Sequence, residues 1–529
     1  MARLVRTPFG RPALEALAAV VRQAQGGDPL APVTVVVPSA PASVSVRRAL
    51  GRHAEGGVAN VRTLALPQLA ELLAAPAASS DGRLPLTPTW TSATIRAGLA
   101  DARPPLSLVP PSAAVEEALA TTFARLREAT DAELRALAGS SPRAEAVIDR
   151  FRDHRERLAD HVDRHELYVL ATAAVRAGTA GLGEVGAVVL HLPRRLGRAE
   201  LELVTALAAA GELTALVGVT GDPDGDRPLQ RLVQQLTPVL GEAVGPEAVE
   251  PPPPAGVVLA PDPEEEAREA VRAVLARVDA GPLDLDRVAI VSRVESPYRL
   301  LLHEHLQEAG LDHHVDLPWS VAQSMPGRVL LGLLDLPERG FRRVEVARWL
   351  RAGPIRWRGR EVPAADWDAV ARRAGVVQGL DQWDARLSAR AAEIAEGVEA
   401  GWLEPEDGER RTEPVLALRE FVADLGAHLA PGVRRTWADW AAWARESLEL
   451  HLDAEASSGS WPEDDRADLE RVLDRLDALA ELDGVDEPPD ASRLRRVLAD
   501  ELGRLHRRVG RLGRGVQVGD LESVYGLDL

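Results

Sequence analysis

The stretch "APVTVVVPSAPASVSVRRAL", residues 31–50, decides the fold class. Residues 33–37 form an uninterrupted, β-branched run that is typical of a short strand buried on both faces. Pro38 and Ser39 end this run, and the residues after them predict a helix over 44–50. A strand that leads through a short turn into a helix is the repeating unit of a parallel sheet with helices on both faces.

The same strand–helix order recurs along the chain and predicts an α/β fold with two sheet-containing bodies. The segment "VEPPPPAG", residues 249–256, separates them, because four consecutive prolines favour an extended polyproline conformation. We expect further strands at 58–66, 187–190, 213–219, 257–259, 288–292, 313–316 and 516–518, and further helices at 67–73, 263–279 and 298–309.

Two long helical segments interrupt these bodies, so we predict four parts. The first α/β core takes residues 1–84 and 166–250, and a helical insertion takes 85–165. The second core takes residues 256–330 and 511–529, and an insertion rich in Trp and Arg takes 331–510.

The composition excludes several kinds of chemistry. The 529 residues hold no cysteine, which rules out disulfides, cysteine nucleophiles and cysteine-ligated zinc or iron–sulfur clusters within them. They also hold no lysine, so all 62 residues counted as Lys or Arg are arginines, and no phosphate-loop lysine, Schiff-base lysine or lysine base can exist here. The net charge of −19 argues against wholesale coating of nucleic acid but leaves room for a local basic groove.

The chain carries no sign of a membrane segment. No apolar span approaches the length of a transmembrane helix, and the first eight residues lack the apolar core of a signal peptide. We therefore expect a cytoplasmic protein with no membrane partner.

Five stretches carry a resemblance to a known family: "VTVVVPS" (33–39), "NVRTLALPQLAELL" (60–73), "VGAVVLHLP" (185–193), "ELTALVGVTGDPDGD" (212–226) and "VQVGDLESVYGLDL" (516–529). Their order and spacing resemble superfamily 1 helicases of the UvrD type. They resemble more closely the AddB/RexB-type subunit of helicase–nucleases, in its actinobacterial form with a PD-(D/E)XK nuclease domain. The resemblance implies two P-loop-NTPase-like (RecA-like) parallel-sheet domains, each with a helical insertion.

The last of these stretches resembles helicase motif V. In the family the chain continues from there into the last helicase motif and the nuclease, so we expect this chain to be a fragment or a truncated copy. Its final apolar run, residues 527–529, is expected to be a strand that needs a partner to pair with.

Where the resemblance places the phosphate loop, this chain has "TPFGRP", residues 7–12. Gly10-Arg11-Pro12 stands where active relatives carry Gly-Lys-Thr/Ser. Arg11 can still touch a phosphate, whereas Pro12 offers neither a hydroxyl for Mg²⁺ nor a backbone N–H. A plain alternative is that Pro12 simply starts a helix.

The other two nucleotide motifs are also incomplete. His191 and Leu192 stand where an Asp for Mg²⁺ and a Glu base are needed, and Asp222 lacks the Gln that would sense the γ-phosphate. Residues 218–226 can equally be an ordinary Gly/Asp/Pro-rich turn. We predict that the motor fold survives without its ATPase: Gly10, Arg11 and Asp222 form a degenerate nucleotide site, no residue is catalytic, and neither ATP nor Mg²⁺ binds.

Histidine-rich segments are candidate metal sites, and we expect none of them to bind metal. His161 and His165 lie four residues apart, with His154 and Glu166 near them in sequence, but a solvated helix face is the favoured interpretation of this charged segment. A second group comprises His303, His305, His313 and His314, and a joint site is not expected because His313 and His314 point to opposite faces of a strand.

Arginine and tryptophan alternate in "ERGFRRVEVARWLRAGPIRWRGRE", residues 338–361, and a second arginine cluster spans 493–514. Arginine neutralises phosphates and aromatic faces stack on unpaired bases, so this pattern suits single-stranded DNA. The predicted contacts here are Arg348, Trp349, Arg356, Trp357 and Arg358. The alternative is that arginine is the general cation of a lysine-free chain and that Trp349 belongs to the helical core. Trp437, Trp440 and Trp443 are expected to be a core stripe.

In related motors single-stranded DNA crosses the loops that follow the strands. If this carries over, Ser39, Arg293 and Tyr298 are further contacts. The resemblance thus implies a helicase-like subunit of a DNA double-strand-break repair helicase–nuclease, which grips single-stranded or broken duplex DNA while a helicase or nuclease partner does the chemistry. Two alternatives stay open: an active ATP-dependent helicase with an arginine-based phosphate loop, and a diverged α/β protein with no DNA role.

Overall fold

The computed structural model describes residues 3–53, 57–80, 82–110, 112–246, 249, 256–430, 436–452, 461–485 and 487–529. Their contacts divide the chain into two compact units. The first comprises Met1–Thr91, Gly98–Pro318 and Arg508–Leu529, and the second comprises Ser92–Ala97 and Trp319–Arg507. Most of the predicted proline linker, residues 250–255, lies outside the described residues.

The first unit contains a five-stranded sheet whose strand order is β1-β7-β6-β2-β3. All neighbouring strands in it are parallel, as the alternation of strands and helices predicted. Its strands are β1 (Arg3–Pro8), β2 (Val33–Val36), β3 (Val61–Leu64), β6 (Ala187–His191) and β7 (Leu213–Val219). The carboxyl ends of all five strands therefore meet at one edge of the sheet.

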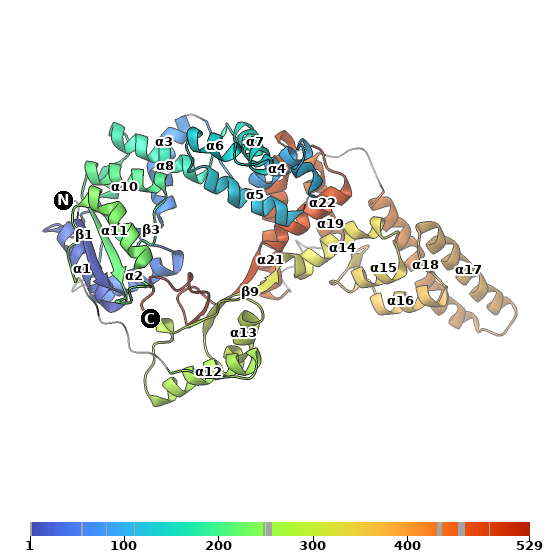
Figure 1. Cartoon of the computed structure of the whole chain (residues 1–529). Coiled ribbons are helices and arrows are strands. Elements are labelled where there is room, and N and C mark those ends of the chain that lie inside the picture. The colour runs from blue at the N-terminus through green and yellow to red at the C-terminus, as the bar shows by residue number, and fades with distance from the viewer. Residues whose placement is uncertain are drawn as a thin grey trace. The chain divides into compact units, whose positions relative to one another are not determined.

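Helices cover both faces of this sheet, and the strand residues alternate between them (Figure 1). On one face, α1 (Arg11–Gln25) and α2 (Ala40–His53) pack against Val33, Val35, Val189 and Leu216. On the other face, α3 (Leu66–Ser80), α8 (Arg164–Ala177), α10 (Arg198–Ala210) and α11 (Arg227–Leu240) pack against Leu4, Val36, Val188, Leu190, Leu213, Ala215 and Val217. This two-sided burial explains why the strands read as continuous apolar runs.

Between α3 and α8 the chain forms helices with polar side chains at their N-termini. These helices are α4 (Pro88–Ala100), α5 (Ala113–Leu126), α6 (Asp131–Ala138) and α7 (Pro142–Arg157), and α9 (Leu182–Val185) follows α8. The side chains of Thr87, Ser112, Thr130 and Ser141 each accept a hydrogen bond from a backbone N–H of the first turn. Such caps satisfy N–H groups that have no partner within the helix. A short pair of parallel strands, β4 (Leu84–Pro85) and β5 (His161–Val162), also lies in this region.

A second sheet has the strand order β12-β9-β13-β8. Its strands are β8 (Ala289–Val291), β9 (His313–Ser320), β12 (His506–Val509) and β13 (Val516–Gly519), and β13 is parallel to both β8 and β9. Val315, Leu317, Val516 and Val518 pack against α12 (Pro263–Ala280) and α13 (Tyr298–Glu308). The chain thus has two parallel-strand regions and is an α/β protein.

The second unit is mainly helical. Its helices are α14 (Met325–Glu338), α15 (Arg343–Leu350), α16 (Ala364–Arg373), α17 (Leu380–Glu399), α18 (Pro405–His428), α19 (Trp437–Leu452), α21 (Glu463–Ala480) and α22 (Ala491–Gly503). A two-stranded hairpin, β10 (Arg356–Trp357) and β11 (Arg360–Glu361), interrupts them. Trp437 and Trp443 are buried, so the predicted tryptophan stripe is core.

Two predicted strands do not form. Residues 257–259 have no regular secondary structure, and Val257, Val258 and Leu259 are largely exposed, so the prediction of a strand there is wrong. Residues 527–529 also form no strand. Instead, Leu527 packs against the core beside α1 and α2, and the buried Asp528 forms ion pairs with Arg52 (2.7 Å) and Arg287 (3.0 Å).

Candidate functional site

The connection between β1 and α1 occupies the predicted phosphate-loop position and is only two residues long. Phe9 and Gly10 separate the two elements, and Gly10 has a φ of 76°, which favours glycine. The Gly10 carbonyl accepts hydrogen bonds from the N–H groups of Ala13 (3.1 Å) and Leu14 (3.3 Å) and so belongs to the first helical turn. A phosphate cradle needs several successive backbone N–H groups that point into one concavity, and two residues cannot supply them.

The side chain of Phe9 fills the sheet edge beside this connection. Its ring lies against Gly218 of β7, where a Cβ would come within 2.4 Å of the ring. Tyr525 meets Phe9 edge to face, with 5.6 Å between ring centroids. Arg194 lies over the Tyr525 ring, with its guanidinium carbon 5.1 Å from the ring centroid, and pairs with Glu522 (3.3 Å). The protein's own side chains therefore occupy the carboxyl end of β7, which lies between the predicted phosphate loop and Asp222.

Arg11 does not point toward this edge as a phosphate ligand would. It is highly exposed and pairs with Glu15, one turn along α1, at 2.8 Å. Exposed pairs of this spacing are ordinary features of helix surfaces. Arg11 is therefore a surface residue in this structure, and Pro12 sits in the first turn as the alternative interpretation expected.

His191 ends β6, where a nucleotide site needs a carboxylate. The side chain is 1% exposed, and neither ring nitrogen has a hydrogen-bond partner among the described residues. Burial lowers the pKa of His191 to about 4, so the ring is neutral at pH 7. A buried neutral imidazole cannot take the place of the Asp–Glu pair that holds Mg²⁺ and activates water.

Asp222 lies in an exposed turn that a different carboxylate organises. Asp226 accepts hydrogen bonds from the N–H groups of Thr220 (2.7 Å) and Gly221 (3.0 Å) and from the Thr220 hydroxyl (2.8 Å). Among the described residues, the carboxylate of Asp222 accepts a hydrogen bond only from the N–H of Asp224 (3.0 Å). This arrangement fits the turn interpretation of residues 218–226. Gly10, Arg11 and Asp222 therefore do not converge on a common ligand position, and the residues present do not fit a bound ATP–Mg²⁺ complex.

Two of the predicted DNA contacts of the first unit, Ser39 and Arg293, lie in loops after strands, and the third, Tyr298, is the first residue of α13. Ser39 follows β2 and its hydroxyl accepts the Ala42 N–H at the start of α2 (3.2 Å). Arg293 follows β8, is exposed, and makes no hydrogen bond or ion pair with a described residue. The Tyr298 hydroxyl donates to Glu266 (2.5 Å), and this carboxylate raises the pKa of Tyr298. Of these three, Arg293 is the side chain with an uncommitted charge.

In the second unit, Trp349 belongs to the core and not to the surface. It is 2% exposed, its indole N–H donates to the Val329 carbonyl (2.9 Å), and it stacks on Phe421. This corrects the prediction that Trp349 contacts DNA, because its ring has no free face for a base. Arg348 is exposed but pairs with Glu345 (2.5 Å).

The other predicted DNA contacts lie in the hairpin β10–β11. Side chains of α18 bind this hairpin. The indole N–H of Trp357 donates to Asp424 (2.9 Å) on α18. Arg358 lies over the Trp357 ring at 4.2 Å and pairs with Glu420 (2.8 Å) and Asp424 (3.6 Å). Arg356 donates to the Gly359 carbonyl (2.7 Å). The polar groups of these three side chains therefore already form hydrogen bonds or ion pairs within the protein.

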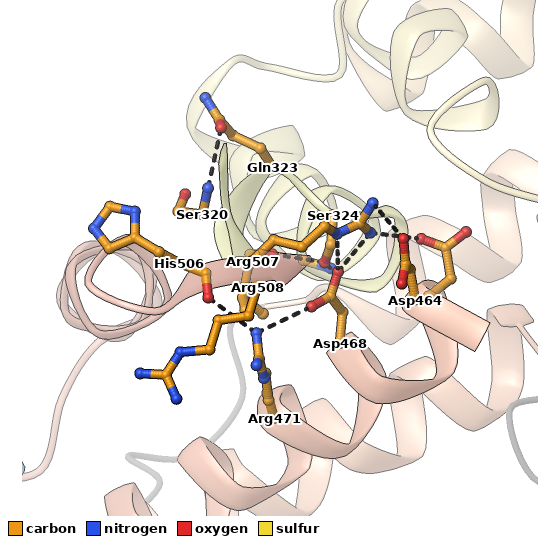
Figure 2. A network of polar contacts seen from close by, with 12 residues as sticks. Ser320, Gln323, Ser324, Asp464, Asp468, Arg471, His506, Arg507 and Arg508 are labelled. Carbon is orange, nitrogen blue, oxygen red and sulfur yellow. Dashed lines mark hydrogen bonds and ion pairs between the residues drawn. The ribbon is translucent and has the colours of Figure 1, made fainter. Parts of the chain in front are cut away.

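The second arginine cluster, residues 493–514, shows the same pattern. In the second unit, Asp468 lies between Arg471 (3.6 Å) and Arg507 (2.7 Å), as Figure 2 shows. Asp468 is 2% exposed, and Arg507 also reaches Asp464 (3.5 Å) and Asp465 (3.4 Å). Carboxylates thus neutralise several arginines of the cluster, which supports the interpretation of arginine as the general structural cation.

The favoured interpretation of the first histidine-rich segment, a single solvated helix face, is wrong. His161 lies in β5 and His165 in α8, so they do not share one helix face. His303 and His313 meet, with 2.8 Å between Nδ1 of His303 and Nε2 of His313, a contact that the sequence did not predict. Within the described ranges, no group of three or more His, Cys, Asp or Glu residues could hold a metal ion.

The residues that close the nucleotide position were not identified from the sequence. Phe9 directly precedes Gly10, so an aromatic residue in place of a small loop residue was the available signal. Tyr525 is far away in sequence, and nothing local points to its contact with Phe9.

No described helix is both long enough and apolar enough to span a bilayer.

Comparison with protein-family models and with curated proteins gave no match for this chain.

Proposed function

We propose that this chain is a helicase-like, DNA-binding subunit of the AddB/RexB type that serves DNA double-strand-break repair without hydrolysing ATP. In this proposal the two parallel-strand regions are RecA-like lobes, and a helicase or nuclease partner supplies the chemistry. The observation that carries the proposal is the occupation of the nucleotide position by Phe9 and Tyr525. A lobe that still bound ATP would need this edge to be open.

The DNA-binding part of the proposal rests on Arg293. Ligands of open parallel sheets bind beyond the carboxyl ends of the strands, and Arg293 stands there with an exposed, uncommitted guanidinium. The arginines of the second unit support DNA binding less well, since many already pair with carboxylates. We therefore place the main contact with the phosphate backbone in the first unit.

Fluorescence anisotropy with a single-stranded oligonucleotide at low salt tests this proposal. We expect binding without ATP that weakens as salt rises, because arginine–phosphate contacts release counterions. R293E should weaken binding, whereas R277E should not, since Arg277 is also exposed and pairs with no residue that the structure describes, but lies in the last turn of α12. Equal effects of the two variants, or no binding at low salt, would favour an α/β protein without a DNA role.

An ATPase assay tests the other half. We expect no hydrolysis above background in the presence or absence of DNA. ATP hydrolysis that the R11A substitution abolishes would overturn the proposal of a subunit without ATPase activity, and would favour an arginine-based phosphate loop.

A further inference from the structure

A large cavity lies within the first unit, away from the filled nucleotide position. Its volume is about 1120 Å³, and α5, α7, β5, α8 and the start of α10 line it. Cavities of several hundred Å³ or more are the usual size of small-molecule sites in proteins.

The carboxylates that line this cavity are largely used by the protein itself. Glu128 and Glu200 cap the start of α10, and Asp163 and Glu166 pair with arginines. The contacts are Glu128 with the N–H of Arg198 (2.8 Å), Glu200 with the N–H of Gly197 (2.9 Å), Asp163 with Arg127 (2.6 Å) and Glu166 with Arg83 (2.5 Å). The remaining lining carboxylate, Glu156, is exposed.

Several lining arginines are not used in this way. Arg125, Arg155, Arg164 and Arg195 make no hydrogen bond or ion pair with any residue that the structure describes. Arg155 lies over the Phe151 ring, with its guanidinium carbon 5.9 Å from the ring centroid. The uncommitted charge around the cavity is therefore positive, which suits an anionic ligand.

His161 adds a buried polar group without a partner. It is 7% exposed, lines the cavity, and its Nδ1 has no hydrogen-bond partner among the described residues. Its ring lies against the Trp90 ring, with 4.0 Å between the centroids and an interplanar angle of 39°. Burial lowers the pKa of His161, so the ring is neutral near pH 7 and can hydrogen-bond to a ligand without adding charge.

The rest of the lining includes apolar surface. Phe123, Phe151, Leu158 and Leu196 contribute side chains to the wall. An inorganic ion would leave most of this volume and surface without a contact, whereas an organic molecule with an anionic group uses both.

We propose that this cavity binds a phosphorylated organic molecule of about nucleotide size, with its phosphate held by Arg155, Arg164 and Arg195 and its organic body against the apolar wall. Guanidinium groups match phosphate oxygens in charge and in hydrogen-bond geometry. The site is distinct from the β1–α1 connection, so the proposal does not depend on the proposed DNA function.

Isothermal titration calorimetry of the full chain with AMP, adenosine and orthophosphate at low salt tests this site. We expect AMP to bind, adenosine to bind at least about tenfold more weakly because it lacks the phosphate, and orthophosphate to bind more weakly than AMP because it lacks the organic body. The R155A and R164A variants should each lose about tenfold in AMP affinity. R143A is the matched control, because Arg143 is an exposed arginine on α7 outside the cavity lining.

The H161F variant keeps an aromatic ring against Trp90 but removes the buried nitrogen, and it should also weaken AMP binding. Far-UV circular dichroism confirms that each variant is folded. No AMP binding at millimolar concentration, equal binding of AMP and adenosine, or equal losses in R155A and R143A would overturn the proposal. AMP binding that R11A abolishes and R155A leaves intact would also overturn it, because it would place the nucleotide at the β1–α1 connection.

Discussion

The Phe9 ring occupies the space into which a side chain on Gly218 would project, since a Cβ there would lie 2.4 Å from the ring. Gly218 is the penultimate residue of β7, and glycine within a strand normally weakens it. Because Gly218 has no side chain, the ring of Phe9, the first residue after β1, can pack against it. A position that a nucleotide-binding lobe would leave open is instead a packed contact.

This contact predicts strong coupling between Phe9 and Gly218. G218A alone should destabilise the protein by about 1–3 kcal/mol, because the added methyl group overpacks against the ring. In the F9A background the same change should cost little, because the ring is gone. A double-mutant cycle of urea unfolding free energies should therefore give a coupling energy of about 1–3 kcal/mol.

G211A serves as the control for this cycle. Gly211 has no heavy atom within 4 Å of its would-be Cβ and does not touch Phe9. Its change in unfolding free energy should be the same in the wild-type and F9A backgrounds. Additive effects of F9A and G218A would mean that Phe9 does not occupy this position in solution.

Opening the edge should not restore nucleotide binding. The F9A variant frees space beside Gly10 but supplies neither a lysine for the phosphates nor a carboxylate at the end of β6, where His191 stands. Equilibrium binding of a fluorescent ATP analogue with Mg²⁺ should therefore stay at background in both wild type and F9A. New binding in F9A that competes with unlabelled ATP would show that the ring alone blocks an otherwise competent site.

His191 predicts a loss of stability in mild acid. Its folded pKa of about 4 lies below the unfolded value of 6.5, so between these values the unfolded chain binds the proton and the folded chain does not. The free energy of unfolding is unaffected by this group above pH 6.5 and falls as the pH drops below it, by about 2 kcal/mol at pH 5. Urea unfolding at pH 7 and pH 5 measures this loss.

The H191L variant should reduce the difference in stability between pH 7 and pH 5 by about 2 kcal/mol, because leucine does not titrate and no hydrogen bond of the imidazole is lost. H506L is the control, since His506 is exposed on β12. An unchanged pH dependence in H191L would show that His191 is not buried as a neutral ring.

The parallel sheets were predictable because they depend on local sequence. Residues 33–37 are all β-branched, and residues 213–219 are mostly apolar, and such runs are typical of a strand buried on both faces. The same rule failed at residues 257–259, which have the composition of a strand but no neighbouring strand in the structure. Pairing is a property of two segments, and one segment cannot reveal it.

For the candidate nucleotide site, the sequence could predict only which residues are missing. The sequence shows that lysine is missing, but it does not show that Tyr525 meets Phe9 across more than 500 residues. Arginine clusters were read as possible DNA contacts because their partners, such as Glu420 for Arg358, lie far away in sequence. Whether an arginine is free or paired depends on the tertiary fold, so charge runs alone could not decide it.

The network around Asp468 predicts that burial, and not the number of ion pairs, decides what a carboxylate contributes. Asp468 is 2% exposed and accepts two hydrogen bonds from Arg507 while it faces Arg471 (Figure 2). D468N should lower the free energy of unfolding by about 1.5–3 kcal/mol, because it removes the charge that these buried contacts require. D464N removes a carboxylate from the same Arg507, but Asp464 is exposed, so it should cost less than about 1 kcal/mol. Thermal and urea unfolding of the two variants in one buffer make the comparison direct. Equal effects, or a larger effect of D464N, would mean that the exposed Asp464 holds Arg507 and that the buried Asp468 does not.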